Sequence, residues 1–372
     1  MKNLFNIRIN KNKEYLMLKE TLEQEKVFKD LVSKYFDTDF NITTKDFPLK
    51  KWDKIVICAS GSSKNAGEIV RYVIEDLAQT TCVVEYASEY AHRKSNLGAK
   101  DLFIAISQSG NTADTFEALN RAKETGACTF AITNDENSKI HKTAHYSVIA
   151  DAGIEKSIAA TKSFTAQLFI LFVFAIALAE QNTKNNLTDL KRDFCALGDL
   201  YKEVFDQRKK IKKIAKTLKK SKSIVVLSRN INSALAKEGG LKIKETCYIN
   251  AISASSGEFL HGHFAFLDRT VPIIAICNKP TDTQENYDLL LNNIYQIKTK
   301  RKTNTIIIKT RNDCFIEERL KNKFSIEIPP VIEIFTPFLN LIALQLIAYE
   351  TAKLIHTDID KPRNLTKCVD NE

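Results

Sequence analysis

The stretch Leu102–Thr115 reads LFIAISQSGNTADT and joins a short apolar run to a polar loop that opens a helical segment. The apolar run has the length and the continuous hydrophobicity of a buried strand. The loop after it contains the hydroxyl groups of Ser107, Ser109 and Thr112. Hydroxyl and unpaired N–H groups at the start of a helix suit a phosphate, because the helix dipole and the free donors both favour negative charge there.

A second polar loop of this kind, Ser60–Ser63, follows the apolar run Lys54–Ser60 and precedes the helical pattern of Asn65–Ala78. Serine and threonine are also ordinary helix N-caps, so one such loop is weak evidence. Two loops at the ends of strands indicate a phosphate site more strongly, because ligands of open α/β sheets gather at that edge. Neither loop matches GxxxxGK[ST] or GxGxxG, which argues against a nucleotide.

Strands and helices alternate along most of the chain, and the pattern runs twice. The first half continues with strands at Cys82–Glu85, Cys128–Thr133 and Tyr146–Ala150 and a closing apolar helix at Ser157–Gln181. The second half has strands at Ser223–Ser228, Val271–Cys277, Asn304–Thr310 and Phe324–Pro329, and helices at Ser233–Tyr248, Asp282–Lys298 and Thr336–Ile355. Such alternation predicts an α/β fold with two mostly parallel sheets flanked by helices, related by duplication. We expect a helical lead-in over 1–45, domains over 46–182 and 183–355, and a tail over 356–372.

Composition narrows the class of protein. Hydrophobic residues make up 44% of the 372 residues, which excludes global disorder. The longest apolar run, Leu168–Ala179, is shorter than the ~20 residues of a membrane-spanning helix and indicates a buried helix. Eight cysteines without a CxxC pair, and six dispersed histidines, favour reduced thiols in the cytoplasm over disulfides or a metal site.

The net charge of +10 includes a dense basic run at Lys209–Lys222. A nucleic-acid surface is one interpretation. A solvated helix face is the plainer one, because Ile211, Ile214 and Leu218 recur at helical spacing and no aromatic residue interrupts the run. We expect no nucleic-acid partner, and a positive field that favours anionic substrates.

Three charged residues of the predicted helix Ser233–Tyr248 share one face: Glu238, Lys242 and Glu245. The spacing alone is more typical of a surface ion-pair ladder than of a catalytic group. A polar loop containing His261 follows, and this histidine is either an acid/base or an exposed side chain.

Both halves resemble the sugar isomerase (SIS) domain family. The whole chain resembles the isomerase portion of the glucosamine-6-phosphate synthases. The similar stretches are Tyr15–Gln24, Ala59–Ser63, Val84–Glu89, Ser107–Thr115, Ala159–Gln167, Glu238–Tyr248, Gly257–Gly262 and Asp360–Lys367. The resemblance implies two tandem SIS domains with a C-terminal catalytic tail, and a homodimer that binds a phosphorylated hexose without a cofactor or a metal ion.

The resemblance also implies roles for individual residues. It places the phosphosugar on Ser62, Ser63, Ser107, Gln108, Ser109, Thr112, Ile158, Ala160 and Glu238. It makes Glu245 the proton-shuttling carboxylate, with Lys242 as a charged neighbour, and His261 the residue that opens the hexose ring across a dimer interface. Lys367 would form an imine with the open-chain ketone. A carboxylate can move a proton between two sugar carbons, and an imine makes that proton more acidic.

Two features leave the reaction open. The chain starts just before the segment that follows the glutaminase domain in the long synthases, so we expect nitrogen from free ammonia or from a separate glutaminase subunit. Ala160 replaces a serine of the synthase pattern, and this region is similar to aminosugar-phosphate deaminases and ketose isomerases, whereas Asp360–Lys367 is similar to the synthases. The alternatives to synthesis are deamination by the same chemistry and a non-catalytic SIS module that senses a phosphosugar. A sensor would not need Glu245, His261 and Lys367 together.

Overall fold

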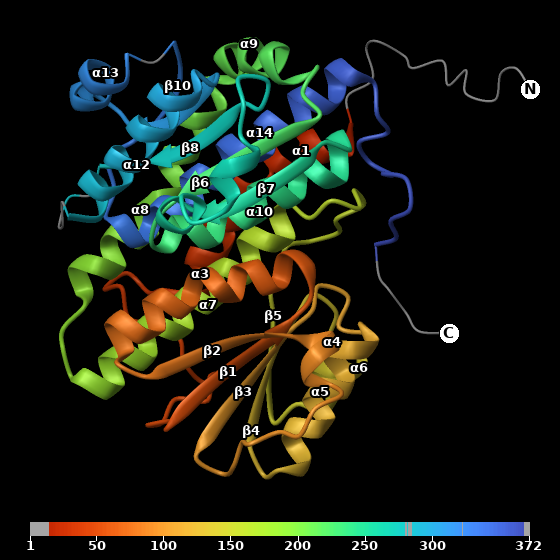
Figure 1. Ribbon diagram of the computed structural model, residues 1–372. Coiled ribbons are helices and arrows are strands. Elements are labelled where there is room, and N and C mark those ends of the chain that lie inside the picture. Colours follow the sequence, from red (N-terminus) through yellow and green to blue (C-terminus); the bar gives the residue numbers. More distant parts are fainter. Residues whose placement is uncertain (1–14, 280, 282–284, 322, 368–372) are drawn as a thin grey trace, which may run out of the picture.

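The computed structural model describes residues 15–279, 281, 285–321 and 323–367. These residues form two α/β domains, each with a five-stranded sheet, and the two sheets lie in separate halves of the molecule (Figure 1).

The first sheet has the order β2-β1-β3-β4-β5, and all its strands are parallel. The strands are β1 (Lys54–Ala59), β2 (Thr81–Tyr86), β3 (Asp101–Ile106), β4 (Cys128–Thr133) and β5 (Tyr146–Ile149). The helices of this domain are α3 (Gly61–Ala78), α4 (Ala87–Tyr90), α5 (Ala113–Glu124), α6 (Lys139–Thr143) and α7 (Lys162–Thr183). Successive residues of a strand face opposite layers. Thus Ile55 and Ile57 join the core cluster shared with α3 and α7, while Val56 and Cys58 join the cluster shared with α5.

The second sheet repeats the first. Its order, β10-β9-β8-β6-β7, is the order of the first sheet when β6 is equated with β1 and β7 with β2. Its strands are β6 (Ser223–Ser228), β7 (Asn250–Ser255), β8 (Ile273–Cys277), β9 (Thr305–Thr310) and β10 (Phe324–Ile328). Its helices are α10 (Ile231–Cys247), α11 (Ser256–Phe259), α12 (Glu285–Arg301), α13 (Cys314–Leu320) and α14 (Thr336–Ile355), with 3-10 turns η1 (His263–Phe266) and η2 (Glu333–Phe335). The predicted internal repeat and the two tandem parallel-sheet domains are therefore confirmed.

The two domains share one hydrophobic core. Helix α3 packs against α10, α7 packs against α3, and α14 packs against α10. Helices α1 (Leu16–Leu22), α2 (Gln24–Tyr35), α8 (Thr188–Phe205) and α9 (Arg208–Leu218) complete the assembly. Phe28 of α2 lies edge-on to Phe169 of α7 and to Phe338 of α14, with ring centroids 5.0 and 5.4 Å apart. This aromatic contact joins the closing helices of both domains.

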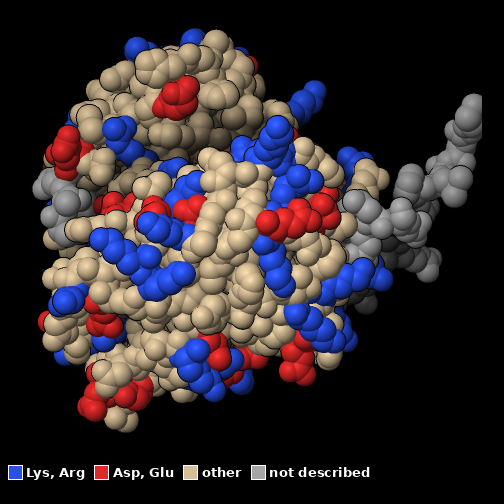
Figure 2. Space-filling model, turned by 90° about the horizontal axis from the view of Figure 1, so that it is seen from below, with Lys and Arg blue, Asp and Glu red and all other residues tan. Residues whose placement is uncertain are grey.

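Helices α7 and α14 are long and apolar enough to cross a membrane by length and composition, but most of each is buried inside the protein. A core helix of a globular protein passes the same test, so this is weak evidence for a membrane. Helix α9 carries the basic run; Ile211, Ile214 and Leu218 are fully buried while its lysines face solvent. The prediction of a solvated helix face is thus confirmed. On the face of the molecule in Figure 2, basic and acidic side chains are interspersed.

Some predicted boundaries are wrong, and two of the errors lie at the site. Helix α3 begins at Gly61, so Ser62 and Ser63 belong to its first turn and not to a loop. Helix α7 begins at Lys162 and not at Ser157, because the preceding residues form an extended segment tied to buried carboxylates. Strand β7 and helix α8 were not predicted. Strand β7 is too polar to be recognised as an apolar run.

Candidate active site

A cavity of about 480 Å³ opens at the C-terminal edge of the first sheet. Five parts of the chain surround it: the start of α3 after β1, the end of β2 with α4, the loop after β3 with the start of α5, the segment before α7, and the tail. Helix α10 of the second domain adds one side chain. The lining includes Ser62, Ser63, Ser107, Gln108, Ser109, Thr112, Ile158, Ala160, Glu245 and Lys367. Ten of the thirteen residues predicted from the sequence therefore meet in one cavity.

The loop after β3 is held in a fixed shape by its own hydroxyl groups. The Ser107 Oγ lies 2.9 Å from the Thr112 Oγ1 and accepts a hydrogen bond from the Gly110 N–H at 3.0 Å. Gly110 has a φ of +65°, and a Cβ there would lie 2.0 Å from the Ser138 Oγ. Only glycine suits this position, so Gly110 is required by the turn itself.

Two helices start at the cavity. Helix α5 has Thr112 as its N-cap and α3 has Ser60, and neither side chain caps its helix by a hydrogen bond. Residues of both first turns line the cavity. Unsatisfied N–H groups at helix N-termini bind anions, and two such termini in one cavity suit a phosphate group.

The charged residues of α10 form a buried cluster beside the cavity. Lys242 is fully buried, with its Nζ 2.6 Å from a Glu245 oxygen and 3.3 Å from a Glu238 oxygen. Glu238 is also fully buried and accepts hydrogen bonds from Ser62 at 2.9 Å and from Asn65 at 2.7 Å. The spacing-based preference for a surface ladder is therefore wrong, because α10 packs this face against α3 of the other domain.

The cluster shifts the pKa values of Lys242 and Glu245. Burial would lower the pKa of Lys242, but the two carboxylates outweigh burial and raise it. Burial raises the pKa of Glu245, the charge of Glu238 raises it further, and Lys242 only partly opposes these two causes. A carboxylate with a raised pKa at the wall of a cavity is a candidate for proton transfer.

Glu238 and Lys242 are among the three predicted residues that lie outside the cavity lining. Both lie behind it, where Lys242 donates to the Ser62 Oγ at 3.1 Å and Glu238 accepts from the same hydroxyl. Their geometry lets them orient Ser62 and Glu245.

His261 is the third. It lies on an exposed turn after α11. Among the described residues, it is not one of those that line the cavity. The sequence-based expectation places this histidine at the site of a second subunit.

The tail 356–367 is irregular and brings Lys367 to the cavity. The Lys367 Nζ donates to the Glu155 Oε2 at 2.6 Å and to the Ser157 carbonyl at 2.7 Å. The sequence analysis did not identify Glu155 as a residue of the site. The available signal was an acidic residue shortly before an apolar helix, where a carboxylate complements the helix dipole.

A family model of the SIS domain matches residues 48–177 and 217–354, one match in each half of the chain. The chain belongs to the SIS domain family. It is 37% identical over 358 residues to a glutamine–fructose-6-phosphate aminotransferase [isomerizing] of Aquifex aeolicus, and this alignment covers 96% of the chain and 58% of that relative. It is 36% identical over 368 residues to the protein of the same name from Chlorobaculum tepidum, with the same coverage. The SIS chain thus spans less than two thirds of the length of these curated relatives.

Solved structures also resemble this chain. The C-terminal domain of glucosamine-fructose-6-phosphate aminotransferase from Francisella tularensis superposes with a TM-score of 0.88 at 29% identity, covering 94% of this chain and 99% of that one. A glucosamine-6-phosphate deaminase from Thermotoga maritima superposes with a TM-score of 0.75 at 21% identity, covering 95% and 99%. At that lower identity the likeness supports the fold alone.

Proposed function

We propose that this SIS protein interconverts fructose 6-phosphate plus ammonia with glucosamine 6-phosphate plus water, in the synthetic direction. The observation that carries this proposal is the meeting of three different groups in one cavity: the hydroxyl loop Ser107–Thr112, the carboxylate of Glu245, and the amine of Lys367. A phosphosugar reaction with imine chemistry needs all three, whereas a binding module needs only the first.

The substrate phosphate binds at the hydroxyl loop and at the start of α5. Ser107 and Thr112 present hydroxyls there, and Ser62 and Ser63, in the first turn of α3, also line the cavity. The sugar carbons then extend from this end of the cavity toward Glu245 and Lys367. Ile158 and Ala160, from the segment before α7, also line the cavity.

The covalent chemistry begins when the Lys367 ammonium loses a proton to solvent and its neutral amine attacks the C2 carbonyl carbon of the open-chain ketose. Loss of one water gives an imine. Ammonia then replaces the lysine nitrogen at C2, which releases the amine of Lys367 and leaves a sugar imine. Glu245 accepts a proton from C1 and returns one to C2 of the resulting enolamine. The product is the 2-amino aldose, and over the cycle one ammonia is taken up and one water released.

His261 opens the sugar ring from the second subunit of a homodimer. Lys242 and Glu238 are positioning residues, since both contact Ser62 and Lys242 also contacts Glu245. No cofactor or metal ion takes part in this scheme.

For the nitrogen source, we propose that this chain uses ammonia, either free or delivered by a separate glutaminase subunit in the cytoplasm. The test measures glucosamine 6-phosphate formed from fructose 6-phosphate with ammonium or with ammonia-free glutamine. Product with ammonium and none with glutamine alone is the expected result. Equal rates with glutamine alone would contradict it.

Deamination is the second candidate. The observation that favours it is Ala160, which lines the cavity at a position where the synthase pattern has a serine. Incubating the protein separately with glucosamine 6-phosphate distinguishes the two. Rapid ammonia release from glucosamine 6-phosphate, with no product from fructose 6-phosphate and ammonium, would support the deaminase. Phosphosugar binding with neither reaction would support a sensor and refute both enzymes.

A further inference from the structure

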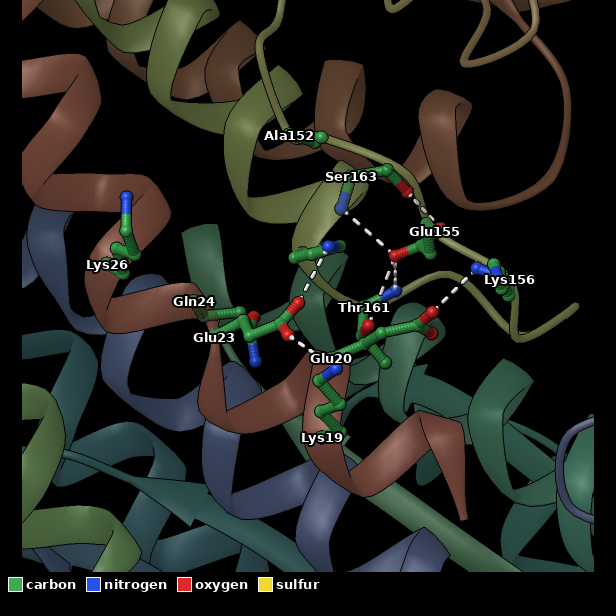
Figure 3. A network of polar contacts seen from close by, with 12 residues as sticks. Lys19, Glu20, Glu23, Gln24, Lys26, Ala152, Glu155, Lys156, Thr161 and Ser163 are labelled. Atoms are coloured by element: carbon green, nitrogen blue, oxygen red, sulfur yellow. Dashed lines mark hydrogen bonds and ion pairs between the residues drawn. The ribbon is translucent and has the colours of Figure 1, made fainter.

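Glu155 has a fully buried side chain that the proposed mechanism does not use. It lies in the extended segment between β5 and α7, and both of its oxygens are occupied. The Oε1 accepts from the Thr161 N–H at 2.9 Å, the Thr161 hydroxyl at 3.1 Å and the Ser163 N–H at 3.1 Å. The Oε2 accepts from the Ser163 hydroxyl at 2.6 Å. Figure 3 shows this carboxylate at the start of α7. Glu155 thus satisfies the N-terminus of the central helix of the first domain.

The same Oε2 is the partner of Lys367. The Nζ of Lys367 lies 2.6 Å from this oxygen and 2.7 Å from the Ser157 carbonyl, which is two residues further along the same segment. The lysine amine is therefore held by two acceptors with fixed positions, one of them charged. Hydrogen bonds to a charged group are stronger and more directional than neutral ones.

The segment that holds Lys367 is itself fixed by the N-terminal helix. Glu20 of α1 is buried and accepts from the Lys156 N–H at 2.6 Å (Figure 3). It also accepts from the Ser157 N–H at 3.2 Å. These bonds fix the backbone on the N-terminal side of Ser157, and the peptide unit that carries the Ser157 carbonyl is fixed by the Ile158 N–H, which donates to the Asp360 carbonyl at 3.0 Å. Glu155 and Ser157 are thus anchored by α7 on one side and by α1 on the other.

The tail is fastened to the same place. The Asp360 carboxylate accepts from the Leu16 and Met17 N–H groups, each at 3.0 Å, and the Asp360 carbonyl accepts from the Ile158 N–H at 3.0 Å. The backbone of the tail is therefore fixed seven residues before Lys367. Closer to the lysine, Pro362 is the last buried residue, and residues 363–366 are exposed. The Arg363 N–H donates to the Tyr248 hydroxyl at 2.9 Å, and the Lys367 amine itself is held by Glu155 and the Ser157 carbonyl.

Glu155 is ionised and unsuited to accept a proton. Burial would raise the pKa of Glu155, but the charge of Lys367 and the hydrogen bonds from Lys367, Ser163 and Thr161 outweigh burial and hold its pKa below the usual value. A carboxylate stabilised in this way is a poor general base and a good electrostatic anchor. Its chemistry differs from that of Glu245, whose pKa is raised.

We infer that Glu155 is the positioning residue for the imine-forming lysine: its carboxylate holds the Lys367 amine at the cavity wall, within reach of a bound sugar. The inference rests on the proposed function, in which Lys367 forms the imine. Glu155 acts through Lys367 and does not touch the sugar. Its removal is expected to slow adduct formation while the phosphate end of the cavity keeps its affinity.

The test compares Glu155→Gln with the wild type in two measurements. The first is the rate at which borohydride traps fructose 6-phosphate on Lys367, followed by mass spectrometry of the peptide. The second is the dissociation constant of glucitol 6-phosphate, which carries the phosphate but has no carbonyl group and cannot form an imine. We expect the trapping rate to fall roughly 10- to 100-fold, the factor for losing a hydrogen bond to a charged group, and the dissociation constant to change less than about threefold.

Glu23→Gln is the matched control. Glu23 also pairs with a lysine at the start of α7, Lys162, at 2.7 Å, but it has no contact with Lys367. This variant is expected to keep the wild-type trapping rate. Glu155→Asp keeps the charge but withdraws it by one methylene, and it is expected to trap at an intermediate rate.

The outcomes separate the inference from the function beneath it. No adduct on Lys367 in the wild type would refute the imine role itself. An adduct in the wild type together with an equal trapping rate in folded Glu155→Gln would overturn only the role of Glu155. A parallel loss of trapping and of glucitol 6-phosphate affinity would also overturn it, since Glu155 would then merely support the cavity wall. If the Gln variant does not fold, a wild-type rate in Glu155→Asp overturns the inference.

Discussion

Glu238→Ala tests whether the buried cluster joins the two SIS domains. Glu238 comes from α10, and its partners Ser62 and Asn65 come from α3 of the other domain, at 2.9 and 2.7 Å. The same carboxylate lies 3.3 Å from the fully buried Lys242 ammonium. Truncation therefore leaves a buried cation with one carboxylate fewer and two polar side chains without their acceptor. Breaking a buried ion pair by removing one partner costs about 3–5 kcal/mol. We expect a loss of this size in the free energy of unfolding.

The assay is urea denaturation followed by circular dichroism and by the fluorescence of Trp52, the chain's single tryptophan, which is buried in the first domain. Glu203→Ala is the control, because Glu203 pairs with Arg311 at the surface, where both side chains are more than 40% exposed. Exposed pairs contribute about 0–1 kcal/mol, so the control should lie close to the wild type. A Glu238→Ala protein that unfolds at the same urea concentration as Glu203→Ala would refute the reasoning.

Three further predictions concern the reaction. Ser107→Ala and Thr112→Val should each raise KM for fructose 6-phosphate by roughly 10- to 100-fold with little change in kcat, because each removes a contact that stabilises the ground state and the transition state equally. A constant KM in steady-state kinetics would mean that the phosphate binds elsewhere. Burial raises the pKa of Glu245, and the protonated carboxyl cannot accept the C1 proton. We therefore expect kcat to fall as the pH drops through a value above the usual glutamate range. A pH profile of kcat whose acid limb lies at or below that range would contradict this. Mixing inactive His261→Ala and Glu245→Gln subunits should restore part of the activity in hybrid dimers, and no recovery after verified subunit exchange would argue against a shared site.

The sequence was sufficient for the architecture. Apolar strands such as Ile55–Ala59 and Leu102–Ile106 are buried on both faces, so their hydrophobicity is continuous and easy to recognise. Strand β7 was missed because it is partly exposed and carries Asn250, Ser253 and Ser255. The start of α7 was misplaced because residues 157–161 (SIAAT) contain no charged residue, glycine or proline to set them apart from the helix, whereas in the structure Glu20 and Glu155 hold this segment.

The site could be predicted only in part, for a physical reason. The loop Ser107–Thr112 is local, so its sequence specifies its shape. The burial of Glu238 and Lys242 depends on α3, about 180 positions away along the chain, and their spacing on α10 resembles that of a surface ladder. The pairing of Lys367 with Glu155 joins residues separated by 212 positions. Replacing Lys367 by alanine would therefore leave the buried Glu155 carboxylate without its cation, which the position of the lysine in the sequence does not indicate.

The central claim is that Lys367 forms a covalent imine with a keto sugar phosphate in this cavity. The most direct measurement is borohydride reduction of the protein with fructose 6-phosphate, followed by mass spectrometry of the modified peptide. Lys367→Arg is the matched variant, because it keeps a cation for Glu155 but cannot form an imine. We predict one reduced sugar-phosphate adduct on Lys367 in the wild type and none in Lys367→Arg. A wild-type protein that makes glucosamine 6-phosphate without any adduct, or a Lys367→Arg protein that remains fully active, would contradict the claim.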